Sequence, residues 1–295
     1  MEAAAVRGYL REPVAATREV EHRLGDRPQD PRVSVVIPTL NEARNLPAVI
    51  VALPPHIHEL IVVDASSRDG TVAIARQGWP GVRVIHQAGR GKGDALALGL
   101  AAASGDVIVT LDGDGSTDPA EIPRFVAALT AGAHFAKGSR FLAGGGSDDL
   151  TRVRRFGARY LTTLVNLLFR TRYTDLCYGY NAFWRECVDH MTLTAKGFEV
   201  ETLMNISAAR SGLVVTEVPS YERARVHGTS NLKVFRDGFR VLRTIVLQRL
   251  APRPSPTPSA AAATPFPKFG RTGVNLLAAM EPAERAAEAT DAPAP

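Results

Sequence analysis

Two acidic residues, Asp112 and Asp114, stand two positions apart directly after an apolar run at residues 107–111. The glycines that follow each of them, Gly113 and Gly115, let the backbone turn without a Cβ penalty. Neighbouring carboxylates repel each other unless a cation neutralises them, and Mg²⁺ or Mn²⁺ takes oxygen ligands together with substrate phosphates. The triplet therefore predicts a site for a divalent metal and a diphosphate. An ordinary Asp-Gly turn is the alternative.

A second candidate is the glycine-rich basic loop at residues 89–94, which includes Gly91, Lys92 and Asp94. It leads into a predicted helix, for which Asp94 is the expected N-cap. Free backbone N–H groups and the helix dipole at such a position favour an anion. No Ser or Thr follows the Gly-Lys pair as a nucleotide P-loop requires. The loop predicts a phosphate-binding segment, with a flexible turn as the alternative.

Two further candidates lie in the second half of the chain. Asp175 adjoins an aromatic-rich stretch at residues 174–184, where apolar surroundings would raise its pKa and suit it to act as a general base. Arg225 and His227 lie beside a glycine turn at Gly228, after a predicted strand at residues 214–218. The planar fork of arginine suits phosphate oxygens, and histidine can ligate a metal or bind phosphate. Core packing of the aromatics and an ordinary surface histidine are the alternatives.

The elements that must position these residues alternate along the chain. Continuous Val/Ile runs predict strands at residues 33–37, 60–63, 82–85 and 107–111, with amphipathic helices at residues 46–53, 71–77 and 94–103 between them. Such runs indicate a parallel sheet covered by helices on both faces, which is an α/β fold. Ligands bind at the carboxyl edge of such sheets, where three of these strands end in polar loops.

The whole chain sets the outer limits. Its 295 residues carry a net charge of +5 and two cysteines, too few for a disulfide framework or a four-ligand zinc site. Residues 1–30 lack the apolar core of a secretory signal, and nine of the 20 prolines lie in residues 251–295. We expect a mobile arm at 1–30, one domain at 31–250 and a disordered tail at 251–295. We also expect no transmembrane segment, and a cytoplasmic location.

One segment concentrates positive charge. Residues 150–174 contain six arginines and no acidic residue, around an apolar run at residues 161–169. A helix there can bury Leu164, Val165, Leu168 and Phe169 at a lipid boundary while arginines face anionic headgroups, and residues 233–249 form a second basic amphipathic segment. The alternative is a core-packed helix whose arginines, including Arg152 and Arg155, bind substrate phosphates.

Taken in order, these motifs resemble family 2 glycosyltransferases, in particular the dolichyl- or polyprenyl-phosphate mannose and glucose synthases. The matching segments lie at residues 35–42, 60–64, 69–71, 89–94, 104–106, 111–114, 138–141 and 218–232. The resemblance covers about residues 32–250 and implies the GT-A fold, a mostly parallel sheet that binds a nucleotide diphosphate sugar. This chain departs from the usual pattern at Ala65 and Ser66 after the base-binding Asp, and at Asn231, where these synthases often carry Lys.

The resemblance also implies roles for individual residues. Nucleotide-sugar contacts fall to Pro38, Thr39, Glu42, Asp64, Gly91, Lys92, Asp94, Asp112 and Gly113. Mg²⁺ or Mn²⁺ would be held by Asp112 and Asp114, and by His227 if the chain is closer to the glucosyl-3-phosphoglycerate synthases. Phosphate and acceptor contacts fall to Arg140, Arg152, Arg155, Arg225, Ser230 and Lys233. The catalytic set is Asp112, Asp114, Arg140 and Asp175.

The predicted reaction moves a hexose from a nucleotide diphosphate sugar to a phosphate acceptor such as polyprenyl phosphate, at the inner face of a membrane. Two alternatives stay open: a soluble transferase that acts on a small phosphorylated or hydroxylated acceptor, and a nonenzymatic nucleotide-binding module. A hydroxyl acceptor would need a general base, for which Asp175 is the candidate. We expect no nucleic-acid partner.

Overall fold

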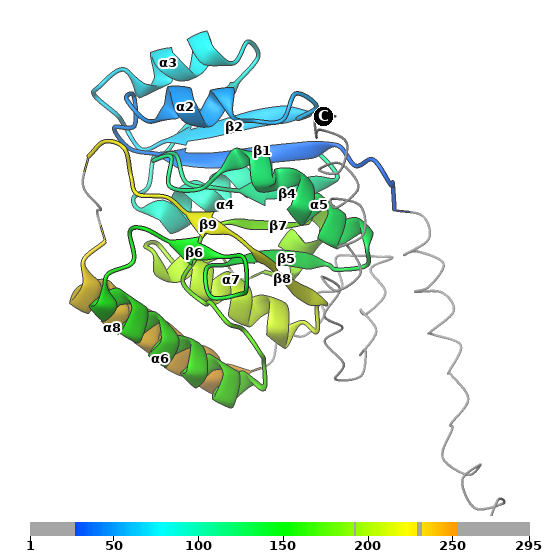
Figure 1. The fold of residues 1–295 in the computed structure, drawn as a ribbon, viewed down its shortest axis with the longest axis vertical. Coiled ribbons are helices and arrows are strands. Elements are labelled where there is room, and N and C mark those ends of the chain that lie inside the picture. The colour runs from blue at the N-terminus through cyan, green and yellow to red at the C-terminus, as the bar shows by residue number, and fades with distance from the viewer. Residues whose placement is uncertain (1–26, 192, 229–231, 253–295) are drawn as a thin grey trace, which may run out of the picture.

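The fold is an open α/β sheet flanked by helices (Figure 1). The structure, a computed structural model, describes residues 27–191, 193–228 and 232–252. The predicted arm at 1–30 and tail at 251–295 therefore lie almost entirely outside the described residues, as does Ser230. None of the helices in the described ranges has the length and apolar character needed to cross a bilayer.

The main sheet has seven strands in the order β3-β2-β1-β4-β7-β5-β8. Their bounds are β1 Val33–Thr39, β2 Glu59–Asp64, β3 Arg83–His86, β4 Val107–Thr110, β5 Phe135–Ser139, β7 Asn181–Trp184 and β8 Val215–Pro219. All neighbours pair in parallel except β7, which runs antiparallel between β4 and β5. A separate parallel pair joins β6 Gly146–Ser147 to β9 Tyr221–Glu222. The predicted mostly parallel α/β sheet is confirmed.

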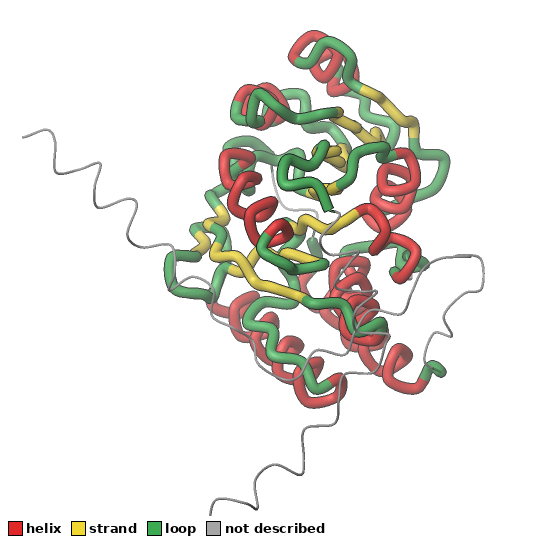
Figure 2. The backbone as a smooth tube through the Cα atoms, turned by 90° about the vertical axis from the view of Figure 1, so that its right-hand side faces the viewer, coloured by secondary structure: helices red, strands yellow, loops and turns green. Residues whose placement is uncertain are grey.

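Helices cover both faces of this sheet (Figure 2). The α-helices are α2 Leu46–Val51, α3 Thr71–Gly78, α4 Lys92–Ala102, α5 Ile122–Thr130, α6 Arg152–Phe169, α7 Glu199–Arg210 and α8 Val234–Leu250, with 3-10 turns η1 Pro119–Glu121 and η2 Arg185–His190. The main core lies around the sheet, where the side chains of β1, β2 and β4 are almost all inaccessible to solvent. A smaller core joins α6, α7 and α8 through Val165, Ile206, Val241 and Ile245.

The start of α4 differs from the prediction. The helix begins at Lys92, with Gly91 at its N-cap in a left-handed conformation (φ 89°). Asp94 is therefore not the N-cap. It lies in the first turn, where its Oδ2 accepts a hydrogen bond of 2.9 Å from Nε2 of Gln87. The cap position requires glycine, because a backbone with this positive φ is strained for any other residue.

The face of α6 that we expected at a lipid boundary is largely turned inward. Val165 is fully buried, and Leu164, Leu168 and Phe169 pack against the smaller core. That part of the prediction was wrong, because the helix has apolar residues on two faces and the sequence does not show which one meets the body of the protein.

Candidate active site

The site begins at the carboxyl edge of three adjacent strands. Thr39 ends β1 opposite Asp64 at the end of β2, and its hydroxyl donates to Asp64 Oδ1 at 3.4 Å. The triplet after β4 packs against the same edge, since a Cβ added to Gly113 would lie 3.1 Å from Cγ2 of Thr39. The predicted nucleoside loop, with Pro38, and the predicted metal triplet are thus neighbours, as the parallel topology requires.

Each carboxylate of the triplet is paired with a cation from another segment. Nζ of Lys92, in the first turn of α4, lies 2.5 Å from Oδ1 of Asp112. Nη2 of Arg225, from the segment after β9, lies 2.5 Å from Oδ2 of Asp114. Burial raises the pKa of Asp114, and the charge of Asp112 raises it further. Two of the basic residues predicted to contact phosphates, Lys92 and Arg225, therefore converge on the two predicted metal ligands.

Glu42 and Asn45 connect this centre to the segment after β9. The Glu42 side chain accepts from Nδ2 of Asn45 at 2.7 Å, and burial raises its pKa, with Asp114 and Asp112 adding to the rise. Asn45 also bonds both backbone groups of His227 at 3.1 Å. Asn45 was not among the predicted residues, because nothing in its local sequence marks it as the anchor of a segment 182 positions away.

The two carboxylates of the Asp112 and Asp114 triplet fit a divalent metal. Mg²⁺ in proteins usually takes one or two carboxylates, with phosphate and water oxygens completing the shell. Asp112 and Asp114 supply such a pair, and both face cationic side chains that compensate the same negative charge. Within the described ranges no three His, Cys, Asp or Glu side chains are grouped closely enough to hold a metal. His227 is thus not assembled with the triplet as a third ligand, contrary to that expectation.

The glycine-rich loop has a different role from the one its sequence suggested. A Cβ on Gly91 would lie 2.1 Å from the carbonyl oxygen of Lys196, and a Cβ on Gly93 would lie 1.9 Å from that of Ala195. The Gly93 N–H already donates to the Lys196 carbonyl at 3.1 Å. These glycines permit close packing of two chain segments, so the Gly93 amide is not a free anion donor. The contribution of the loop to the site is the Lys92 side chain.

Glu201 is a site residue that the sequence did not reveal. It lies on α7, is buried, and its Oε1 is 2.5 Å from Nζ of Lys92. Burial raises the pKa of Glu201, and Asp112 raises it further, while Lys92 opposes both effects. Burial alone would lower the pKa of Lys92. The charges and hydrogen bonds of Asp112 and Glu201 outweigh this effect, so the pKa of Lys92 lies well above its usual range. In sequence, Glu201 looks like any acidic residue in the first turn of a helix.

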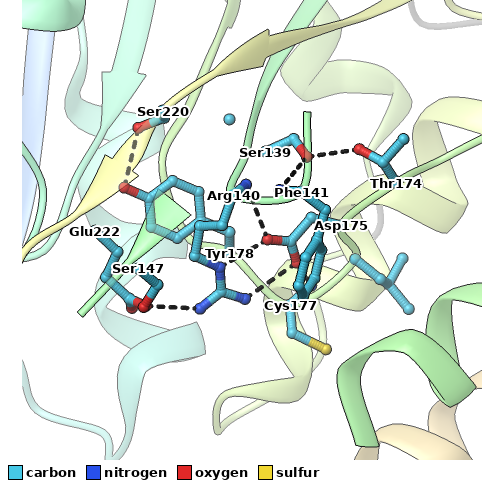
Figure 3. A network of polar contacts seen from close by, with 12 residues as sticks. Ser139, Arg140, Phe141, Ser147, Thr174, Asp175, Cys177, Tyr178, Ser220 and Glu222 are labelled. Atoms are coloured by element: carbon cyan, nitrogen blue, oxygen red, sulfur yellow. Dashed lines mark hydrogen bonds and ion pairs between the residues drawn. The ribbon is translucent and has the colours of Figure 1, made fainter. Parts of the chain in front are cut away.

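Arg140 and Asp175 form a buried ion pair, drawn in Figure 3. Nε of Arg140 donates to Oδ2 of Asp175 at 2.7 Å and Nη2 donates to Oδ1 at 3.1 Å, while Nη1 donates to Glu222 at 3.0 Å. The guanidinium also lies 4.9 Å from the ring centroid of Tyr178. Burial alone would raise the pKa of Asp175, but the charge and hydrogen bonds of Arg140 outweigh it, so the pKa lies below its usual value.

This geometry corrects two expectations. Asp175 is completely buried and both of its oxygens accept hydrogen bonds from Arg140, so it has neither the raised pKa nor the exposure of a general base. Arg140 is held by two carboxylates, so it is not an open phosphate receptor in this arrangement. The pair fixes the end of β5 to the segment before β7.

The remaining predicted acceptor residues lie at the N-terminal ends of α6 and α8. Arg152 in the first turn of α6 and Lys233 at the N-cap of α8 are exposed, as is Arg155. Among the described residues, the triplet forms ion pairs with Lys92 and Arg225 and with none of these three. They lie on the two helices that border a pocket.

That pocket lies between α6, α7 and α8 and has a volume of about 680 Å³, its open mouth included. Leu161, Ala158 and Val241 give it apolar walls from α6 and α8. Glu201 is one of its lining residues and, through Lys92, connects it to Asp112. Two successive ion pairs therefore link the pocket to the predicted metal ligands.

Comparison with known proteins decides the family. The model of "Glycosyl transferase family 2" matches residues 34–192, which include all three strand-end loops of the site. The chain belongs to this family. It is a glycosyltransferase, as the order of its motifs predicted.

Relatives of this glycosyltransferase include three with assigned names. It is 32% identical over 214 residues to glycosyltransferase AglJ of Haloferax volcanii, covering 72% of this chain and 70% of that one. It is also 32% identical to the polyprenol monophosphomannose synthase of Mycolicibacterium smegmatis (68% of this chain, 81% of that one). The dolichol-phosphate mannosyltransferase of Pyrococcus furiosus is 32% identical as well, over 68% of this chain and 59% of that one.

Solved structures of similar fold include the glucosyl-3-phosphoglycerate synthase of Mycobacterium tuberculosis. Its complex with Mn²⁺, UDP and glucosyl-3-phosphoglycerate matches this family 2 glycosyltransferase with a TM-score of 0.62 and 26% identity, over 82% of this chain and 86% of that one. The same enzyme has been solved with Mg²⁺ and UDP, at a TM-score of 0.61. The predicted GT-A architecture is confirmed.

Proposed function

We propose that this enzyme transfers a hexose from a nucleotide diphosphate sugar to the phosphate of a polyprenyl phosphate, with Mg²⁺ or Mn²⁺ held by Asp112 and Asp114. The observation that carries the choice of acceptor is the apolar pocket between α6, α7 and α8, which is linked to the triplet through Glu201 and Lys92. An isoprenoid chain needs such apolar walls, and its phosphate needs a cation, which Lys92 beside Glu201 or Arg154 in the pocket wall can supply. Two relatives named for polyprenol and dolichol phosphates support the same acceptor class.

The chemistry follows from charge. The metal, when bound, neutralises the diphosphate as it departs, and such stabilisation of developing charge is usually the largest catalytic effect. Lys92 and Arg225 already lie 2.5 Å from the two carboxylates, so each can turn to a phosphate oxygen once the metal takes its carboxylate. Donor binding by Pro38, Thr39, Glu42 and Asp64 is part of this proposal, because these residues share the strand edge with the triplet.

A phosphate acceptor also fits a site in which Asp175 is not available as a general base. A phosphate oxygen is already anionic near neutral pH, so the acceptor needs no strong general base. Asp175 is committed to Arg140 and cannot supply one. We place the reaction at the cytoplasmic face of a membrane, where a polyprenyl phosphate is held by its chain.

A second candidate is transfer to a small soluble phosphorylated acceptor. The solved structures with phosphoglyceric acid favour it, since their enzyme shares this fold and 25–26% identity. The two candidates differ in the role of the apolar pocket, which a small polar acceptor would leave without a function.

Acceptor choice is tested with the full chain, Mn²⁺ and a panel of labelled nucleotide sugars. Each donor is offered with polyprenyl phosphate in detergent micelles or with 3-phosphoglycerate in water, and the products are identified by mass. We expect a hexosyl phosphate ester of the polyprenol. Hexose found only on 3-phosphoglycerate would support the second candidate, and no transfer from any donor would support a nonenzymatic nucleotide-binding role.

A further inference from the structure

The outer face of α6 carries a stripe of exposed apolar side chains. Val153, Phe156, Tyr160 and Leu167 recur at helical spacing, and Phe156 and Leu167 are each 76% exposed. They lie on the side of the helix opposite Ala158 and Val165, which are buried. Nothing within the described residues covers this stripe.

The second stripe is on α8. Phe235, Phe239, Val246 and Leu250 recur at the same kind of spacing, and Phe235 is 88% exposed and Leu250 77% exposed. They lie opposite Val241 and Ile245, which are buried. The two helices pack against each other along one edge of the molecule (Figure 1). Because both bury their inner residues in the same small core, both stripes face away from the body.

The charges on this face are all of one sign. The exposed charged side chains of α6 and α8 are arginines: Arg152, Arg155, Arg159, Arg236, Arg240, Arg243 and Arg249. Neither helix contains an acidic residue other than Asp237, which is buried and accepts from the Lys233 backbone at 2.7 Å. Asp237 also pairs with Arg240 at 3.6 Å and with Arg236 at 3.8 Å, so a single carboxylate stands against seven arginines. A surface that combines exposed aromatics with such an excess of arginine is complementary to anionic lipid headgroups over an apolar interior.

We propose that the outer face of α6 and α8 is a docking surface for an anionic lipid bilayer, with its aromatics inserted at the headgroup boundary and its arginines against lipid phosphates. A second copy of the chain fits less well, because a two-fold contact would set arginines against arginines. The inference deepens the proposed function and rests on it in one respect: docking brings the two helices that line the acceptor pocket to the surface that holds a polyprenyl phosphate.

Cosedimentation of the full chain with vesicles tests the docking surface. Vesicles of phosphatidylcholine alone are compared with vesicles that also contain phosphatidylglycerol, at low and high salt. We expect binding to the anionic vesicles only, and loss of that binding at high salt, because arginine near an anionic surface acts through a screened charge. A protein that stays in the supernatant with anionic vesicles at low salt would overturn the proposal.

Two variants separate the apolar and the charged parts of the surface. Phe156→Ser/Phe235→Ser/Phe239→Ser removes exposed aromatics, and Arg243→Glu/Arg249→Glu reverses two charges on α8. We expect each to weaken binding about tenfold or more. The matched controls are Val51→Ser, an exposed apolar residue on α2, and Arg76→Glu/Arg185→Glu, which reverses two exposed charges elsewhere. Equal binding by the surface variants and wild type would refute the surface.

Light scattering on the same samples tests whether a second copy of the chain covers this face instead of a lipid bilayer. If the wild type is a dimer in solution and the phenylalanine variant a monomer, the face is a contact between copies and the lipid proposal fails. A separate assay of transfer to detergent-solubilised polyprenyl phosphate, which needs no membrane, distinguishes a failure of docking from a failure of the proposed function. Docking variants should retain transfer in micelles, whereas a wild type that binds vesicles but transfers nothing would refute the function and leave the docking surface standing.

Discussion

In the proposed metal site, Lys92 and the metal would compete for the carboxylate of Asp112. Nζ of Lys92 lies 2.5 Å from Asp112, so a metal that binds Asp112 must displace a fixed positive charge. Lys92→Met should therefore raise the affinity of the nucleotide-free protein for Mn²⁺, by about tenfold given ~1 kcal/mol or more for a unit charge at this range. Titration followed by electron paramagnetic resonance measures free Mn²⁺, and Lys233→Met, an exposed lysine, is the control. Weaker Mn²⁺ binding by the Lys92 variant would contradict this account of the apo site.

The buried Arg140 and Asp175 pair predicts an effect on stability. Asp175→Asn leaves a buried guanidinium without its main partner, which typically lowers the free energy of unfolding by about 3–5 kcal/mol. Asp149→Asn removes the half-buried partner of Arg154, near the surface, and should cost at most about 1 kcal/mol. Urea unfolding compares the two. An Asp175 variant of normal stability that has lost the acidic limb of its pH-rate profile would restore Asp175 as a general base.

Site residues were predictable from the sequence where a strand end placed them. Asp112, Asp114, Thr39 and Asp64 follow buried apolar runs, so the parallel topology alone brings them to one edge. Glu201 reaches the site from a helix face, through packing that no local pattern encodes. The sequence marked Asp175 as an acid among aromatics, but it could not reveal a partner 35 positions away that changes its role.

At the scale of elements, strands rich in Val and Ile were predictable, including the edge strands β3 and β8, whereas β5 and β7 were not. β1, β2 and β4 are continuous Val/Ile runs, which indicate burial on both faces. β5 carries a buried lysine, Lys137, and β7 is a four-residue strand within an aromatic stretch that looked like packing. The antiparallel insertion of β7 between β4 and β5 is a tertiary arrangement that periodicity cannot specify.

The contacts of His134, just before β5, predict how the stability of the fold responds to acid. His134 is buried and its Nδ1 accepts from the Val214 N–H at 3.0 Å. Burial, with the charges of Arg27 and His190, lowers the pKa of His134 to about 4. The unfolded chain, with an ordinary pKa near 6.5, therefore binds more protons between these values, and stability is lost as pH falls from about 6.5 towards about 4.

The loss attributable to His134 is of order 3 kcal/mol, because the pKa values of about 6.5 and about 4 differ by about 2.5, at 1.36 kcal/mol for each pH unit. Chemical unfolding at several pH values measures it. His134→Asn keeps an acceptor near the Nδ1 position but has no proton to gain, so its stability should change less between pH 6.5 and 4.5. An unaltered pH dependence in this variant would show that another group controls the acid transition.

At the scale of the molecule, we predict that the domain described up to Pro252 carries the stability. Nine prolines among small residues in 251–295 supply little apolar surface to bury. Truncation after Pro252 keeps the carbonyl oxygens of Ala251 and Pro252, both of which accept from Arg210. Its melting temperature should stay within about 2 °C of the full chain. A fall of several degrees would show that the later residues stabilise the domain.

The central claim is that Asp112 and Asp114 hold the metal for a nucleoside diphosphate, and one titration tests it most directly. Calorimetry measures the binding of UDP and of GDP to the full chain, with and without Mn²⁺, for the wild type and for Asp112→Asn/Asp114→Asn. We predict that Mn²⁺ tightens binding of at least one nucleotide to the wild type, and that the variant keeps its melting temperature but loses this metal-dependent gain. A variant that binds both nucleotides as tightly as the wild type in Mn²⁺ would contradict the account.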